Sequence, residues 1–203
     1  FDQFAFDGAI MITASHLPFN RNGYKFFDRD GGLEHDDITK ILETASELTV
    51  ADAGLSGVEK VDSISVYCEF LREKIKKSIQ AVDYDKPLAG LHIVVDTGNG
   101  AGGFFVDKVL NPLGADASGS QFLEPDGHFP NHIPNPENKQ AMEAIRQAVL
   151  TNKADLGIIF DTDVDRMSAV LPNGDEVNRD AIIAMMTAII AEDYPGGTIV
   201  TDS

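Results

Sequence analysis

Three carboxylates alternate along one short stretch of the chain, at Asp161, Asp163 and Asp165. They follow directly on the apolar run 156–160, whose composition is typical of a buried strand. Carboxylates so close in sequence repel one another unless a cation lies between them. Loops that follow strands in α/β folds are also where ligands gather. The spacing therefore predicts a metal site, and the alternative is an exposed acidic loop without an ion.

The ligand types favour magnesium over calcium. An EF-hand calcium loop needs glycine at its sixth position and a bidentate glutamate at its twelfth. Counted from Asp161, those positions hold Arg166 and Pro172. Three carboxylates with open coordination positions suit Mg²⁺ that is bound jointly with a phosphate. Arg166, beside the carboxylates, is a candidate to clamp a phosphate oxygen.

A turn of small residues, 13–18, contains Ser15 and His16 and follows the apolar run 8–12, which is expected to be a buried strand. Such a turn presents the Ser15 hydroxyl outward, so Ser15 is a candidate nucleophile; an ordinary turn serine is the alternative. Adjacent residues on an extended segment point to opposite sides, so His16 need not be the base for Ser15. The chain has no Gly-x-Ser-x-Gly elbow, which disfavours a serine hydrolase.

Two cations, Arg21 and Lys25, lie in the segment 20–27, which is rich in asparagine and aromatic residues. A lysine that aromatic neighbours partly desolvate can act as a general acid or base. The alternative for this segment alone is an ordinary surface lysine.

The run Gly98-x-Gly100-x-x-Gly103 follows an expected strand and precedes an expected helix, as a dinucleotide-binding fingerprint requires. The acidic residue that should follow, Asp116 or Glu124, is not at the end of a clear second strand. A tight structural turn is therefore favoured.

His128 and His132 lie four residues apart, but Pro130 and Pro134 exclude the helix that would bring them together on one face. A zinc site is therefore not favoured.

Apolar periodicity predicts the elements that must position these residues. Strands are expected over 8–12, 91–95, 156–160, 167–171 with 176–177 as a hairpin, and from about 198; helices are expected from Asp36 or Asp37 to about 48, over 66–79, over 104–113, from Asn135-Pro136 onward, and over 180–191. Alternation of strands and helices indicates the α/β class, with mixed, largely parallel sheets flanked by helices.

Composition narrows the choice of partners. The 203 residues carry a net charge of −17, which disfavours nucleic acid and anionic membranes but not small phosphorylated substrates. No apolar window is long enough to span a membrane. A lone cysteine, Cys68, is expected to be a buried thiol, and it excludes an internal disulfide and fits a reducing cytoplasm.

Taken together and in this order, the motifs resemble those of the α-D-phosphohexomutases, which include bacterial phosphoglucomutase/phosphomannomutase. Residues 13–18 are similar to the phosphoserine loop of that family, 22–25 to the segment with the catalytic lysine, and 161–166 to the magnesium loop. The stretch 125–132 resembles the segment before that metal loop.

The metal loop departs from the family pattern at two positions. Thr162 and Val164 stand where the family commonly has glycine between the aspartates. The ligand side chains are unaffected, so the departure bears on loop flexibility.

The resemblance implies a phosphotransferase that interconverts hexose 1-phosphate and hexose 6-phosphate, with glucose or mannose as the sugar. The phosphoryl group passes through a phosphoserine and a hexose 1,6-bisphosphate intermediate. The implied roles are catalysis by Ser15, Lys25 and His16, phosphate binding by Arg166 and Arg21, and magnesium binding by Ser15, Asp161, Asp163 and Asp165. The alternatives are a magnesium-dependent phosphohydrolase and a non-catalytic metal-binding fragment.

The family has four domains, and the resemblance covers part of them. Residues 1–62 are expected to be the later part of domain 1, 63–176 a complete domain 2, and 177–203 the start of domain 3. Both ends of the chain have the character of a cut, so a fragment without turnover of its own is expected. The identity of the hexose and the oligomeric state stay open.

Overall fold

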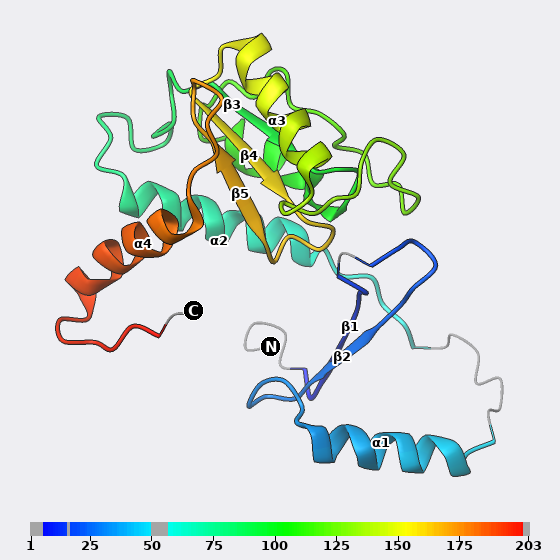
Figure 1. The fold of residues 1–203 in the computed structure, drawn as a ribbon. Coiled ribbons are helices and arrows are strands. Elements are labelled where there is room, and N and C mark those ends of the chain that lie inside the picture. Colours follow the sequence, from blue (N-terminus) through cyan, green and yellow to red (C-terminus); the bar gives the residue numbers. More distant parts are fainter. Residues whose placement is uncertain (1–5, 16, 50–56, 201–203) are drawn as a thin grey trace. The chain divides into compact units, whose positions relative to one another are not determined.

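The computed structural model describes residues 6–15, 17–49 and 57–200 (Figure 1). The chain divides into two compact units, Phe1–Ser63 and Ile64–Ser203, and each is described by itself.

The first unit is built on a hairpin of two antiparallel strands, β1 (Ala9–Ile12) and β2 (Tyr24–Phe27). A strand was expected at 8–12, but the expectation that it is buried is wrong. Ile10 and Ile12 keep 59% and 68% of their surface exposed. A two-stranded sheet needs other elements to pack on it before its side chains are buried. In this unit no described residue is fully buried.

Helix α1 (His35–Glu47) follows the hairpin. It begins after Glu34, so the predicted capping role of Asp36 or Asp37 is wrong. Both aspartates lie inside the first turn, where negative charge interacts favourably with the helix dipole. The carbonyl of Glu34 accepts the first backbone hydrogen bonds of the helix.

A three-stranded mixed sheet forms the centre of the second unit, in the order β3 (Ile93–Asp96), β4 (Leu156–Phe160), β5 (Met167–Val170). Strands β3 and β4 are parallel, and β4 and β5 are antiparallel. Residues 116–121 run parallel to β3 through two isolated bridges. The mixed α/β class is therefore confirmed, while the bridging segment was not expected.

Helices pack on the sheet and form two separate apolar cores with it. Helix α3 (Lys139–Asn152) packs Ala141, Ile145 and Val149 against strand residues of one core. Helix α2 (Ser63–Ser78) buries Cys68 in the other core, as expected for this thiol, and Figure 1 shows the two helices on opposite sides of the sheet. Burial of apolar side chains is the main stabilising contribution to such a layered fold.

The start of α3 differs from the prediction of a helix opened by Asn135-Pro136. The cap is Asn138, whose side chain accepts hydrogen bonds from the backbone N–H groups of Gln140 and Ala141. Asn135 instead accepts from the N–H of Glu137 and closes a separate turn. The stretch therefore holds two candidate caps, and the second one begins the helix.

The helix expected over 104–113 has an irregular form. A 3₁₀ turn, Ala101–Gly103, precedes a π-helical turn, Val106–Leu110. The N–H of Asn111 donates to the carbonyl of Val106 over 3.0 Å, which is the wide i to i−5 bond. Pro112 follows and has no N–H with which to continue a regular helix.

At the end of the described chain, helix α4 (Arg179–Asp193) confirms the helix expected over 180–191, and Asn178 caps it. The strand expected from about 198 is wrong for residues 198–200, which form no strand. A strand needs a hydrogen-bonded neighbour, and no described backbone pairing provides one; residues 201–203 lie outside the described part. None of the described helices combines the length and the hydropathy that a membrane span requires.

Candidate active site

The aspartate loop joins β4 to β5, and it brings the three predicted ligands together. One carboxylate oxygen from each of Asp161, Asp163 and Asp165 lies within 4.8 Å of the others. Asp161 is buried, Asp163 is half-buried and Asp165 is exposed. The carboxylates thus form a graded cluster that opens toward solvent and that could hold a metal ion.

Arg166 closes this loop at its far end. Its Nε donates to Asp161 Oδ2 over 2.9 Å, and its backbone N–H donates to Asp161 Oδ1 over 3.1 Å. The same Nε lies 3.5 Å from Asp165 Oδ1. The guanidinium therefore contacts the carboxylates directly, and its predicted role in phosphate binding stays a prediction.

Burial raises the pKa of Asp161, and a hydrogen bond with Asp165 and the charges of Asp163 and Asp165 act in the same direction. The backbone N–H of Arg166 partly opposes this rise. Without a cation the cluster therefore retains a proton more readily than an isolated aspartate does. A divalent ion would offset the repulsion, so the donor set fits a hard metal ion.

Thr162 and Val164 separate the three aspartates. The hydroxyl of Thr162 is buried with no hydrogen-bond partner among the described residues, which leaves one polar atom beside the carboxylates unsatisfied. Val164 has a φ of +68°, a left-handed conformation that costs a β-branched residue roughly 1–3 kcal/mol. The two departures from the glycine pattern therefore appear as strain and an unsatisfied hydroxyl in a defined loop.

The glycine-rich loop after β3 supports the aspartate loop. A Cβ on Gly100 would lie 2.8 Å from the carbonyl oxygen of Thr162, and a Cβ on Gly103 would clash with the carbonyl of Leu123. The N–H of Ala101 donates to the carbonyl of Thr162 over 2.9 Å. Close backbone packing explains these glycines without a nucleotide, in agreement with the structural turn favoured from the sequence.

The turn that carries Ser15 lies at the end of the β1–β2 hairpin. Ser15 is half-buried and has a φ of +54°, and its N–H donates to Thr13 Oγ1 over 3.0 Å. The N–H of Thr13 in turn donates to the carbonyl of Gly23 over 3.0 Å. A left-handed conformation of this kind is unfavourable for a non-glycine residue, and the role of Ser15 as nucleophile stays a prediction.

Of the other predicted residues, Lys25 and Arg21 lie on the same hairpin as Ser15. Lys25 is exposed in β2 and pairs with Met11, and Arg21 is exposed in the connecting loop. His16 lies outside the described residues. The hairpin and the aspartate loop belong to different units of the chain.

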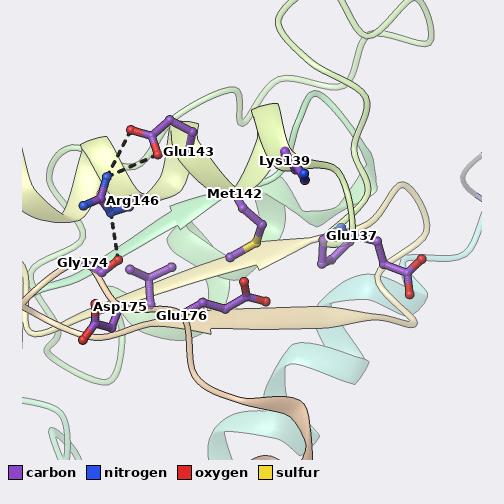
Figure 2. Close-up of a pocket in the computed structure, with 10 residues that line it drawn as sticks. Glu137, Lys139, Met142, Glu143, Arg146, Gly174, Asp175 and Glu176 are labelled. Carbon is purple, nitrogen blue, oxygen red and sulfur yellow. Dashed lines mark hydrogen bonds and ion pairs between the residues drawn. The ribbon is translucent and has the colours of Figure 1, made fainter.

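A separate hollow of about 500 Å³ lies between the beginning of α3 and the turn after β5 (Figure 2). Arg146 at its wall donates to the carbonyl of Gly174 over 3.1 Å and contacts Glu143, so these polar groups are already engaged. None of the predicted site residues lines this hollow.

Comparison with known protein families shows which family the chain belongs to. Residues 65–174 match the model for the phosphoglucomutase/phosphomannomutase alpha/beta/alpha domain II, which is more than half of the chain, and residues 1–50 match domain I of the same family. The chain belongs to the phosphoglucomutase/phosphomannomutase family. The aspartate loop falls inside the domain II match, and the Ser15 turn falls inside the domain I match.

Individual members of the phosphoglucomutase/phosphomannomutase family align along nearly the whole chain. It is 31% identical over 207 residues to a phosphomannomutase from Salmonella montevideo, covering 97% of the chain and 43% of that protein. It is 30% identical over 193 residues to a phosphomannomutase/phosphoglucomutase from Pseudomonas aeruginosa, covering 95% and 39%. The chain thus spans about two fifths of these relatives.

A solved structure has the same fold. The phosphoglucomutase/phosphomannomutase family protein from Burkholderia thailandensis superposes with a TM-score of 0.74 at 26% identity. The match covers 94% of this chain and 39% of that one.

Sequence reasoning missed one arrangement in this mutase-family chain. His132 is buried against Asp96, 36 residues away, whereas the sequence presents it only as a disfavoured zinc ligand. An aspartate as the last residue of an apolar strand was the available signal, but the sequence does not reveal its partner.

Proposed function

We propose that the complete protein is a phosphohexomutase that interconverts hexose 1-phosphate and hexose 6-phosphate, with glucose or mannose as the sugar. The observation that carries the proposal is the clustering of Asp161, Asp163 and Asp165 in a chain of this family. An acidic cluster of this kind suits phosphoryl transfer, in which catalysis consists mainly of positioning and charge neutralisation.

In the proposed mechanism Ser15 carries the phosphoryl group. The free hydroxyl of the hexose phosphate attacks the phosphorus, the new P–O bond forms, and the bond to Ser15 Oγ breaks. Lys25 accepts the proton from the attacking hydroxyl at its Nζ. A hexose 1,6-bisphosphate results, and after it turns around, Ser15 takes the other phosphoryl group while Lys25 returns the proton.

We assign the metal to the three aspartates together with the phosphate on Ser15. Magnesium bound there would neutralise phosphate charge and stabilise the serine alkoxide as leaving group. Arg166, next to the carboxylates, and Arg21, on the Ser15 hairpin, are the proposed phosphate-binding cations. A catalytic role for His16 rests on the sequence resemblance alone.

Replacement of Ser15 tests the assignment. Ser15→Ala in the complete protein should abolish isomerisation of hexose 1-phosphate, because no side chain remains to hold the phosphoryl group between the two half-reactions. Ser46→Ala, at an exposed helix position in the same unit, is the control and should retain turnover. Substantial turnover by Ser15→Ala would contradict the proposal.

The same assay separates a mutase from a phosphohydrolase. Phosphorylated complete protein incubated with hexose phosphate should yield the isomer and little free phosphate, whereas a hydrolase would release phosphate in proportion to time. The chain spans about two fifths of the length of its relatives. We therefore propose that turnover needs the complete protein, and that the 203 residues alone bind metal but do not turn over substrate.

A further inference from the structure

A buried ion pair joins His132 to Asp96 in the second unit. The two side chains are 1% and 0% exposed. His132 Nε2 lies 3.0 Å from both carboxylate oxygens of Asp96, and Nδ1 lies 3.0 Å from the carbonyl oxygen of Ile133. A carbonyl oxygen and an ionised carboxylate only accept hydrogen bonds, so both ring nitrogens donate. The geometry is therefore that of an imidazolium facing a carboxylate.

The surroundings of the pair agree with a charged ring. Burial by itself lowers the pKa of His132, but the hydrogen bond and the charge of Asp96, together with the hydrogen bond to the carbonyl of Ile133, outweigh it and leave this pKa above its ordinary value. Asp96 also accepts from Gln121 Nε2 over 2.7 Å and from the N–H of Gly98 over 2.8 Å. A buried charge pair persists only when its remaining hydrogen-bonding capacity is satisfied in this way.

The pair leads directly into the glycine-rich loop. Asp96 ends β3, and Gly98 follows with a φ of +52°. A Cβ on Gly98 would lie 2.9 Å from His132 Cε1 and 2.7 Å from Pro134 Cβ, so the loop rests closely on the histidine segment. His132 and Pro134 therefore leave no room for a side chain at position 98, and the N–H of Gly98 is held by Asp96 Oδ1.

From Gly98 the contacts continue to the metal loop. The N–H of Gly100 donates to the carbonyl of Thr97 over 2.7 Å, and the N–H of Ala101 donates to the carbonyl of Thr162 over 2.9 Å. The peptide that Ala101 holds lies between the ligands Asp161 and Asp163. The ion pair and two metal ligands are thus connected through five residues of continuous backbone, 97–101.

A second set of contacts ties the glycine-rich loop to the segment that carries His132. Asn99 Oδ1 accepts from Asn131 Nδ2 over 2.8 Å, and the carbonyl of Asn99 accepts from the N–H of Asp126 over 2.9 Å. The segment 126–132 therefore holds the glycine-rich loop at both a side chain and the backbone.

We propose that His132 and Asp96 are positioning residues that fix the glycine-rich loop and thereby set the affinity of the aspartate loop for a divalent cation. The inference rests on the metal site of the proposed function. Substitution of residues that orient metal ligands typically weakens binding about 10–100-fold, and because this pair acts through backbone we expect a loss near the lower value, about 10-fold.

The test is a titration of the 203-residue chain with Mg²⁺ alone, followed through the amide NMR signals of residues 161–166. His132→Gln should bind Mg²⁺ about 10-fold more weakly than the unchanged chain. His128→Gln is the matched control, because His128 is 79% exposed in the same segment and bonds to Asp126, and its affinity should be unchanged.

A spectroscopic measurement on the unchanged chain tests the charge state directly. The ring ¹⁵N signals of His132 should show both nitrogens protonated at a mildly alkaline pH, above the ordinary pKa of histidine. Asp96→Asn should return His132 to a neutral ring and should also weaken Mg²⁺ binding. A neutral His132 ring in the unchanged chain would overturn the ion pair from which the positioning role is argued, even if His132→Gln does not fold.

The outcomes separate this inference from the proposed function. If the unchanged chain binds Mg²⁺ and folded His132→Gln binds it equally well, the positioning role is overturned and the mutase proposal stands. If the unchanged chain shows no Mg²⁺-dependent shifts at residues 161–166, the metal site itself is wrong and the positioning role is wrong with it.

Discussion

At the residue scale, the metal loop combines backbone strain with side-chain packing at Val164. Its φ of +68° is unfavourable for a β-branched side chain, yet that side chain packs against the apolar core that includes Phe160, and its methyl group lies beside Gly102. Glycine, common at this position in the family, would adopt the conformation freely but would lose these contacts. Strain and packing therefore oppose each other at one residue.

Because strain and packing oppose each other, alanine should destabilise the chain more than glycine does at position 164, the reverse of the usual order. Val164→Ala loses the packing and retains the unfavourable φ, so it should destabilise the chain by about 1–2 kcal/mol. Val164→Gly should destabilise it less, because the strain disappears. Denaturant unfolding of both variants measures the difference. At Val95, in regular strand β3, the order should be the ordinary one, with glycine worse than alanine; the same order at position 164 would refute the account.

The raised pKa of Asp161 predicts a pH dependence of stability. An aspartate in the unfolded chain ionises at lower pH than folded Asp161, so between the two pKa values the unfolded chain binds fewer protons. Without metal, the contribution of this group to the free energy of unfolding should therefore fall as pH rises through that interval.

Added Mg²⁺ should reverse this trend, because it binds the ionised carboxylates. The rise in Tm that Mg²⁺ produces should grow from acidic to neutral pH, as measured by thermal unfolding with and without the ion. Asp161→Asn is the comparison and should show little Mg²⁺-dependent rise at any pH. A rise that is equally large for both proteins would exclude Asp161 as a ligand.

At the scale of elements, helix α3 packs on the sheet of the second unit, and its first turn depends on an N-cap. Asn138 is the residue whose side chain caps the backbone of the first turn, although Asn135 comes earlier and is followed by a proline. The two asparagines therefore have different expected effects on stability.

Asn138→Ala should lower the free energy of unfolding by about 1 kcal/mol, which is typical for loss of an N-cap. Asn135→Ala removes a single turn hydrogen bond to the N–H of Glu137 and should cost less. Chemical unfolding monitored by circular dichroism provides both values. A larger loss at Asn135 would move the functional start of the helix back to the position expected from sequence.

The elements that sequence predicted well are those whose evidence is local. The buried stripe of α3, the strand before Asp161 and the hairpin after β5 each have a periodicity or turn within one window. The segment 116–121 has no such signal, because its pairing with β3 is interrupted. Between its two bridges the backbone N–H of Val95 donates to the hydroxyl of Ser120 in place of a carbonyl.

The same limit applies to the candidate site. The aspartate cluster was predictable because three ligands lie within five residues. The pairing of His132 with Asp96 and the exposure of β1 depend on which segments meet in space, and a single sequence does not contain that information. The division of the chain into mutase domains stays a prediction.

At the scale of the whole molecule, the chain carries a net charge of −17 and two separate units. The candidate nucleophile lies in one unit and the candidate metal ligands lie in the other. Mutase chemistry as proposed requires both, so the relative placement of the units in the complete protein is a condition of activity. The loss of turnover expected for Ser15→Ala belongs to this scale, since it is an effect on the assembled enzyme.

Because Cys68 in helix α2 is buried, the reactivity of its thiol can be used to measure local opening of the chain at this helix. The thiol is 1% exposed and packs in the core with Leu113 and Val109, so a thiol reagent can reach it only when α2 separates from that core. The labelling rate, compared with that of a cysteine in the unfolded chain, should give the free energy of this separation.

If α2 opens only with global unfolding, labelling of Cys68 and chemical denaturation should yield the same free energy. A smaller value from labelling would show that the helix detaches while the sheet stays folded. Because this thiol is the single cysteine of the chain, the measurement needs no substitution, and the native protein can be compared directly with and without Mg²⁺.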